Sequence, residues 1–229
     1  MRAVRFAAAL ALAVTTAAGQ ARQFVPPAGY SGGPARPAVA APAERGAPPL
    51  TRLSDAGLQP LFAIDPHYAR ADHARVKVVG AFAIATPAGV RLAAAWGLGF
   101  LPVTLRFSDG RCFTFAAAYE NGTLSEGRLT AAPCDRRVRA AENPAPPPPA
   151  DHPLRWVGSS WGQDAWVDDR AHTTLVTAPF GKTFTPLFTA RFAADAILAM
   201  TGPDYPGGNV TLVGRIGGRL SVVTLEVSW

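Results

Sequence analysis

The sequence of 229 residues is poor in cysteine and contains only Cys112 and Cys134. A structural zinc site would need two further ligands at local spacing, and neither His67 nor His73 completes such a pattern. A redox pair usually has C-x-x-C spacing, which this pair does not have. In an oxidising compartment an isolated pair most simply forms a disulfide, which would stabilise the fold by about 3 kcal/mol. We therefore predict a Cys112–Cys134 disulfide, and we expect neither a metal site nor a cofactor.

The sequence also lacks an apolar run of the roughly 20 residues that a membrane-spanning helix needs. The later apolar stretch at 92–103 is interrupted by two glycines and a proline. At the N-terminus, Arg2 and Arg5 precede apolar residues 6–14 and a group of small residues. This order is typical of a secretory signal peptide, which we place at 1–21. We expect a soluble mature chain in a bacterial periplasm, associated with the outer membrane only through partners.

A continuous basic track is missing as well. The formal net charge is +6, but the basic residues are almost all arginines that occur singly along the chain. Nucleic-acid binding proteins usually carry clustered Lys and Arg with interleaved aromatic residues, which follow the phosphates and bases. We therefore expect no nucleic-acid partner.

Proline, in contrast, is abundant, with 22 residues. Segments 22–53 and 141–153 combine proline with few large apolar residues, which predicts a disordered or polyproline-like leader and a semi-rigid linker. The linker would separate an N-terminal domain at 54–140 from a C-terminal domain at 154–229. Both domains contain alternating apolar runs bounded by turn residues. The sequence therefore predicts an all-β fold of two small β-sandwich-like modules.

Turn signals locate several hairpins in the predicted domains. In the first domain, "TPAG" (86–89) and "SDG" (108–110) each lie between two strand-like runs, and "ENGT" (120–123) marks another turn. In the second domain, the segment "TPLFTARFAADAILAM" (185–200) fits either a helix or two short strands that meet about Ala193–Asp195. Periodicity does not decide between these two alternatives.

The clearest hairpin signal lies between Val210 and Trp229. Gly217-Gly218 supplies the positive φ angles that a two-residue turn requires. This turn would pair Leu212 with Val223 and collect the apolar side chains on one face, with threonines such as Thr211 on the other. We expect Thr211→Asp to destabilise the module much less than Leu212→Asp.

Residues 158–162, "GSSWG", match the G-x-S-x-G pattern of serine hydrolases, with Ser160 as the nucleophile and His172 downstream. That motif requires a strand, a sharp turn and a helix within a sheet built from βαβ units. The sequence has neither an amphipathic helix after Ser160 nor βαβ patterns. We interpret the segment as a glycine-serine loop and expect no catalytic residue.

Three carboxylates follow the same segment. Asp164, Asp168 and Asp169 could act as a paired acid and base, or bind Ca²⁺. Their spacing lacks the alternation of a calcium-binding loop, and aspartates frequently bond nearby backbone N–H groups in turns. We predict that "DDRA" (168–171) is a turn between two strands.

Aromatic residues supply the remaining candidates. Trp156, Trp161 and Trp166 recur every five residues, a spacing that would allow a stacking platform, although burial of such rings in a small domain is commoner. The chain ends on an alternating apolar stretch with Trp229. We select Trp161, Trp166, Phe188 and Trp229 as candidate partner-binding residues.

Three segments within 165–227 resemble, in order, the C-terminal domain of the TrbG/CagX-like family. They are "AWVDDRAHTTLVTAP", the 185–200 segment and "GGNVTLVGRIGGRLSVVTLEV". The family pattern has an Asp-Asp turn, a Pro-Leu-Phe strand and a "GN…V…R" strand that leads into the last hairpin. The matching residues are Val167, Asp168, Asp169, His172, Thr173, Pro179, Pro186, Leu187, Phe188, Gly208, Asn209, Val213 and Arg215.

This resemblance implies a non-enzymatic subunit of the outer-membrane complex of type IV secretion and conjugation systems. Such a subunit would act through protein–protein interfaces in a ring-forming oligomer. The partners that the resemblance implies are a small outer-membrane lipoprotein and an inner-membrane-spanning channel subunit. One alternative is a stand-alone periplasmic β-sandwich binding protein, and another is a G-x-S-x-G serine hydrolase.

Overall fold

The computed structural model describes residues 46–70, 72–134, 153–179, 184–201 and 207–229. Almost all regular structure in these ranges is β-strand, so the all-β prediction is confirmed. The helical segments are α1 (Asp55–Leu58) and the 3-10 turn η1 (Gln59–Leu61). The predicted signal peptide, the leader up to residue 45 and the linker up to residue 152 lie outside the described residues.

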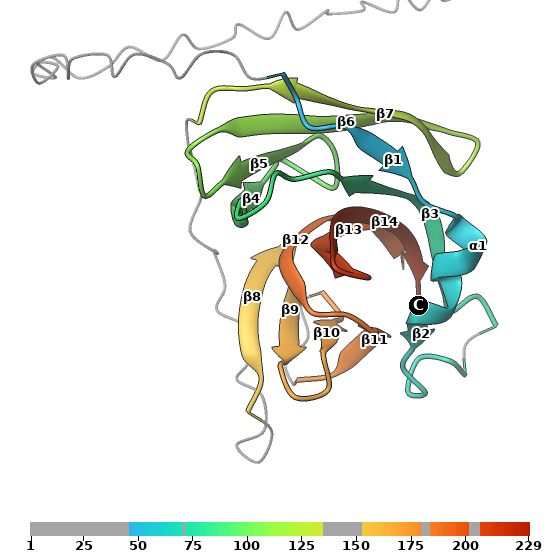
Figure 1. The fold of residues 1–229 in the computed structure, drawn as a ribbon. Coiled ribbons are helices and arrows are strands. Elements are labelled where there is room, and N and C mark those ends of the chain that lie inside the picture. Colours follow the sequence, from blue (N-terminus) through green and yellow to red (C-terminus); the bar gives the residue numbers. More distant parts are fainter. Residues whose placement is uncertain (1–45, 71, 135–152, 180–183, 202–206) are drawn as a thin grey trace, which may run out of the picture. The chain divides into compact units, whose positions relative to one another are not determined.

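The strands form three antiparallel sheets (Figure 1). The central sheet has the order β1 (Leu50–Arg52), β3 (Arg75–Ile84), β14 (Arg219–Ser228), β13 (Gly207–Ile216) and β12 (Ala194–Thr201). The β9 sheet has the order β2 (Phe62–Ile64), β11 (Pro186–Ala190), β10 (Thr173–Thr177), β9 (Gln163–Asp168) and β8 (Arg155–Ser160). The β5 sheet has the order β4 (Leu92–Trp96), β5 (Val103–Phe107), β6 (Cys112–Glu120) and β7 (Thr123–Ala131).

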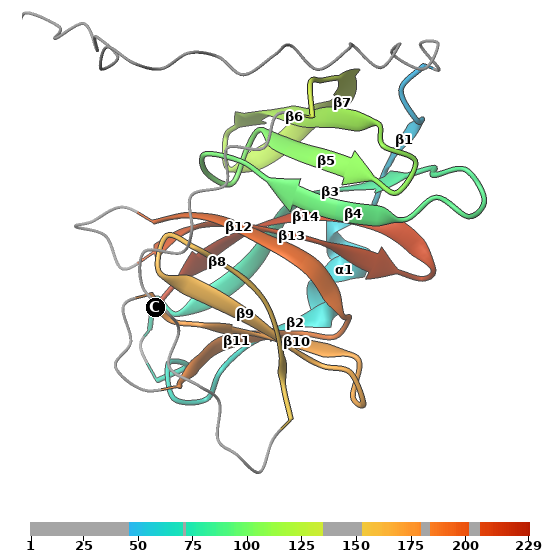
Figure 2. The same cartoon turned by 90° about the vertical axis from the view of Figure 1, so that its left-hand side faces the viewer.

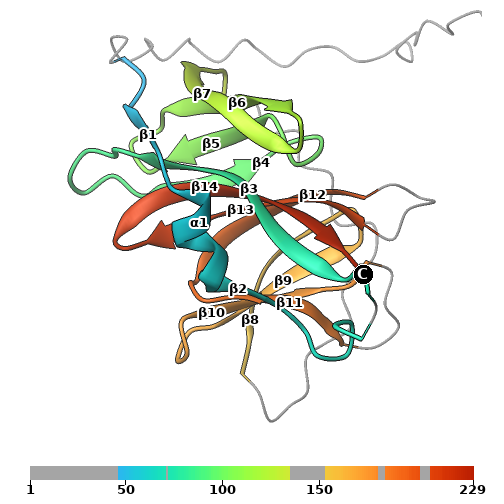
Figure 3. The ribbon, with the colours of Figure 1, turned by 90° about the vertical axis from the view of Figure 1, so that its right-hand side faces the viewer.

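The central sheet lies between the other two and is covered on both faces (Figures 2 and 3). One hydrophobic core joins it to the β9 sheet and includes Leu212 and Phe188. A second core joins it to the β5 sheet and includes Phe82 and Phe115. A strand that is buried on both faces needs a nearly continuous apolar run, which β3 has. The two sandwich-like layers therefore share one sheet.

The strands are not divided between the predicted domains at 54–140 and 154–229. β3 pairs with β14 along most of its length, and β2 pairs with β11. The described residues from 46 to 229 form one compact unit. The proline-rich segment between the two halves therefore does not separate two sets of paired strands, because both larger sheets combine strands from each half.

The predicted leader ends earlier than expected. Residues Leu50–Arg52 form β1 and pair with β3, and the Leu53 N–H donates to the Ala81 carbonyl at 2.9 Å. Leu50 packs against one core and Leu53 against the other. The prediction of disorder is wrong for residues 50–53, because Leu50 and Leu53 bury apolar surface on the two sides of the central sheet.

The hairpin predictions had mixed outcomes. β5 and β6 pair around "SDG", and β6 and β7 pair around Asn121 and Gly122, whose φ angles are 51° and 73°. The "TPAG" hairpin is wrong, because residues 85–91 carry the chain from the central sheet to the β5 sheet, where β4 pairs with β5. The ambiguous segment at 185–200 forms two strands, β11 and β12, which belong to different sheets.

The final hairpin has the predicted register. Leu212 pairs with Val223, and the turn residues Gly217 and Gly218 have φ angles of 56° and 78°. On its second face Thr211 pairs with Thr224 as expected, but this face is buried, so the expectation of a mild Thr211→Asp effect is wrong. The Thr211 side chain is fully buried and lies 2.8 Å from the Thr224 hydroxyl, because the β5 sheet covers this face as well.

The predicted disulfide joins Cys112 to Cys134, with an S–S distance of 2.06 Å. It ties β6 to the segment after β7, and Cys112 is buried. A disulfide is typical of proteins in oxidising, extracytoplasmic compartments, and this one is consistent with such a location.

Replacing both cysteines with serine should lower the free energy of unfolding by about 3 kcal/mol, because the open chain regains loop entropy in the unfolded state. Urea unfolding of the oxidised protein and of the double serine variant measures the difference. Equal unfolding midpoints would show that the bridge adds no stability.

Candidate functional site

The Asp-Asp segment is a turn, as predicted. β9 and β10 pair up to Asp168 and Thr173, and one Asp168 carboxylate oxygen accepts the N–H groups of Arg170 and Ala171 at 2.8 and 3.0 Å. Asp169 forms an ion pair with Arg155 at 2.9 Å. The hydrogen bond from Arg155 lowers the pKa of Asp169 below its ordinary value. Both carboxylates therefore hold the turn and the neighbouring strand together.

Asp164 lies apart from this turn, in a buried position on β9. Burial raises the pKa of its carboxyl, while hydrogen bonds from Trp156 and Ser159 oppose the shift. The Trp156 indole nitrogen lies 3.4 Å from Asp164 Oδ1. Within the described ranges, no three His, Cys, Asp or Glu side chains gather where they could hold a metal ion.

Ser160 and His172 lie at opposite ends of β9. Ser160 is paired with Gln163 at the start of the strand, whereas His172 follows its last residue in the next turn. Six residues of extended strand separate the two ends by roughly 17 Å, so the two side chains cannot share a proton. The Ser160 hydroxyl accepts the Ala199 N–H at 2.9 Å and lies 3.3 Å from the Ala199 carbonyl oxygen. The Ser160 hydroxyl therefore links the end of β8 to β12.

Two of the four candidate partner-binding residues lie in the interior. Phe188 is fully buried in the core between the central and β9 sheets, and Trp166 is buried beneath the Phe184 ring, 5.9 Å away. Neither ring can reach a partner in this fold, so these two assignments are wrong. Trp229 is half-buried against the same core. Only Trp161 is widely accessible, with 49% of its surface exposed.

Trp161 belongs to a group of exposed and half-buried apolar side chains, which we call the Trp161 surface. Its indole nitrogen lies 3.5 Å from the Leu98 carbonyl oxygen. Gly99 lies against the Met200 side chain, and the Phe100 and Tyr119 rings meet edge to face at 6.0 Å. The Trp161 surface consists of Leu98, Phe100, Tyr119, Trp161 and Met200.

Four separate segments build the Trp161 surface. Trp161 occupies a turn between β8 and β9 and has a φ of 50°. Residues 97–102 pass over β12 so closely that a Cβ at Gly97 would lie 2.9 Å from a Leu198 methyl carbon. Leu98 remains 96% exposed. A concentration of large apolar side chains on a surface usually marks an interaction site.

Sequence reasoning found only one member of this surface. Leu98 and Phe100 lie in "GLGF", where glycines flank large apolar residues outside any alternating run. This break in the pattern could have indicated that the two apolar side chains lie at the surface. Tyr119 and Met200 lie near the ends of β6 and β12, and only the folded arrangement brings them to Trp161.

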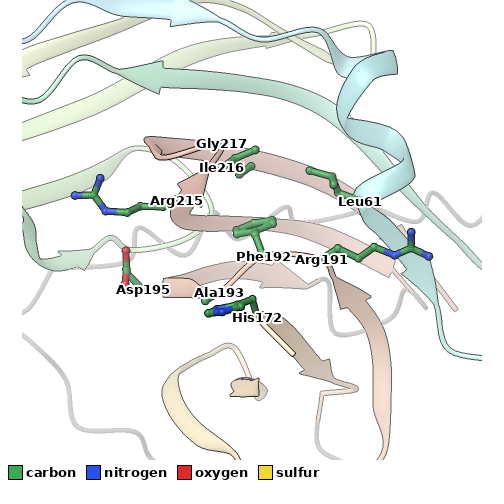
Figure 4. A pocket seen from close by; sticks show the side chains of 9 residues that line it. All are labelled: Leu61, His172, Arg191, Phe192, Ala193, Asp195, Arg215, Ile216 and Gly217. Carbon is green, nitrogen blue, oxygen red and sulfur yellow. The ribbon is translucent and has the colours of Figure 1, made fainter. Parts of the chain in front are cut away.

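A second feature, the Phe192 hollow, has a volume of about 480 Å³ (Figure 4). The β9–β10 turn, the corner between β11 and β12, the last hairpin turn and η1 contribute to its wall. Its apolar side is formed by Phe192, Ile216 and Leu61, and its polar side chains are His172, Arg191, Asp195 and Arg215.

No protein-family model, curated protein or solved structure matches this chain. Among the described residues, no helix is long and apolar enough to cross a bilayer.

Proposed function

We propose that this chain is a non-enzymatic periplasmic assembly component of a type IV secretion or conjugation channel, and that it binds its neighbours through the Trp161 surface. The partners would be those that the family resemblance implies, a small outer-membrane lipoprotein and an inner-membrane-spanning channel subunit, within a ring-forming oligomer. The observation that carries the interaction role is the clustering of Leu98, Trp161 and Met200, which are all widely exposed.

The chemistry of the Trp161 surface suits a protein interface. Aromatic residues and methionine are enriched in interfaces, and tryptophan and tyrosine dominate their binding energy. Trp161 and Tyr119 combine large apolar rings with polar groups that can bond a partner. Tyr119 and Met200 lie on paired strands, so the backbone beneath these two side chains is ordered before a partner binds.

Three further observations support the proposal. The segments that carry the family resemblance form, in order, the Asp-Asp turn, strand β11 and the final hairpin. The Cys112–Cys134 disulfide suits an exported protein. Strands β7 and β8 end their sheets and offer backbone groups for pairing with a partner strand.

The native mass of the protein in mildly solubilised bacterial envelopes tests this role. We expect the wild type in an assembly much larger than the 23.9 kDa chain, and the Trp161→Ser, Met200→Ser double variant mainly as free protein. Trp156→Ser is the matched control, because Trp156 is 50% exposed but lies outside the Trp161 surface. A wild-type protein that is monomeric in the presence of secretion-system proteins would refute the proposal.

The absence of catalysis gives a separate prediction. Ser160→Ala should lower the free energy of unfolding by about 1 kcal/mol, because the Ala199 N–H loses its acceptor. Any turnover of ester or amide substrates should be the same in the variant and the wild type. A hydrolase activity that Ser160→Ala abolishes would contradict this reading of the "GSSWG" segment.

A further inference from the structure

The Phe192 hollow has a rigid apolar floor. Phe192 is buried and meets the Phe62 ring edge to face at 5.9 Å, so its ring is held by the core between the central and β9 sheets. Ile216 and Leu61 are half-buried against the same core. The floor can therefore receive an apolar group without rearranging.

The backbone places a carboxylate beside this floor. Pairing between β12 and β13 shifts between Ala194 and Ala196, which leaves Asp195 as the extra residue of a β-bulge. Bulges commonly redirect a side chain next to a binding site. Gly214 permits the close approach of this corner, because a Cβ there would lie 2.7 Å from the Ala193 carbonyl oxygen.

Asp195 and Arg215 lie on the same side of Phe192, and the head groups of Arg215 and Arg191 point away from the Phe192 ring in opposite directions (Figure 4). In the part of the chain that the structure describes, no ion pair or hydrogen bond joins Asp195 to Arg215. Arg215 uses one N–H on the Gly218 carbonyl at 3.1 Å and retains its other donors. Two opposite charges therefore border the hollow with unused hydrogen-bonding capacity.

The pKa of Asp195 reflects its position at the edge of the hollow. Although the residue reaches the surface, burial of its carboxyl raises the pKa, and the charges of Arg215 and Arg155 partly oppose that shift. Among the described residues, Asp195 is exposed and has no direct hydrogen-bond partner. A cationic group placed against it would form a charge-assisted hydrogen bond.

We infer that the Phe192 hollow binds a free α-amino acid with an apolar side chain. The ammonium group bonds Asp195, the carboxylate bonds Arg215, and the side chain lies on Phe192 and extends towards Leu61. One α-carbon carries both charged groups, which suits two opposite charges on the same side of the floor. The volume of about 480 Å³ lies within the usual range for small-ligand sites. This site lies in a different part of the molecule from the Trp161 surface, and the inference does not depend on the assembly role.

Calorimetric titration of the purified mature chain with L-phenylalanine tests the inference. We expect saturable binding, and at least tenfold weaker binding of phenethylamine, which lacks the carboxylate, and of 3-phenylpropionate, which lacks the ammonium group. Asp195→Asn and Arg215→Gln should each weaken phenylalanine binding at least tenfold, and Arg106→Gln, an exposed arginine on β5, should leave it unchanged.

Two results would overturn the inference. One is the absence of saturable phenylalanine binding at millimolar concentrations. The other is equal binding of phenylalanine and one of its two analogues, because one of the charged residues would then play no part. Thermal melts of the two variants verify that they remain folded, so that a loss of binding reports on the site.

Discussion

Leu212→Asp should destabilise the protein by at least about 4 kcal/mol, because it places an unpaired carboxylate in a core without polar partners. Leu212 is fully buried on β13 and belongs to the core between the central and β9 sheets. Thr211→Asp should be nearly as damaging, since Thr211 is also fully buried and is bonded to Thr224. Urea unfolding of the two variants measures both effects.

The exposed residue Arg219 at the end of the same hairpin provides the control. Arg219→Asp should change the free energy of unfolding by no more than about 0.5 kcal/mol, because the Arg219 side chain is exposed. A mild effect of Thr211→Asp, close to that of Arg219→Asp, would mean that the second face of the hairpin is open to water. The three-layer arrangement would then be incorrect.

Phe188→Ala should lower the free energy of unfolding by about 3–5 kcal/mol, the usual cost of removing a buried ring. Phe188 has no exposed surface and packs between β11 and the central sheet. Trp161→Ala should cost less than about 1 kcal/mol, since half of that side chain is in water. Thermal and urea unfolding of the two variants separate a core residue from an interaction residue. The reverse order of effects would restore Phe188 as a surface candidate.

Local sequence patterns predicted the elements that depend on neighbouring residues. The final hairpin was predicted to the residue, because the Gly217-Gly218 turn fixes the register of the strands that it joins. The "ENGT" and "DDRA" turns were predicted for similar reasons, since Asn-Gly and Asp side chains stabilise turns on their own. The disulfide was predictable because the sequence contains no other cysteine.

Contacts between distant segments were not predictable in the same way. Alternation along 210–227 shows which side chains share a face, but it does not show that a second sheet covers the threonine face. The apolar run of β3 could have indicated a strand buried on both sides. The pairing of β3 with β14 joins two segments that are far apart in the sequence. The proline-rich segment between them suggested a domain boundary instead.

Only a small part of the candidate site was predictable, because its residues come from segments that are distant in the sequence. Tryptophan is typical both of cores and of interfaces, so residue type alone could not separate Trp166 from Trp161. Exposure separates them, and exposure is set by which loops and sheets lie above each ring. Met200 and Leu98 become interface candidates only after residues 97–102 are placed over β12.

Photo-crosslinking from position 98 in living cells tests the central claim most directly. Leu98 is the most exposed large apolar residue in the described ranges, so a photoreactive amino acid there should not disturb the fold. We predict a discrete adduct with a secretion-channel protein, which disappears when Trp161→Ser is added and does not form from position 106 on the neighbouring strand β5. No adduct at position 98, or the same adduct from positions 98 and 106, would contradict an assembly role for the Trp161 surface.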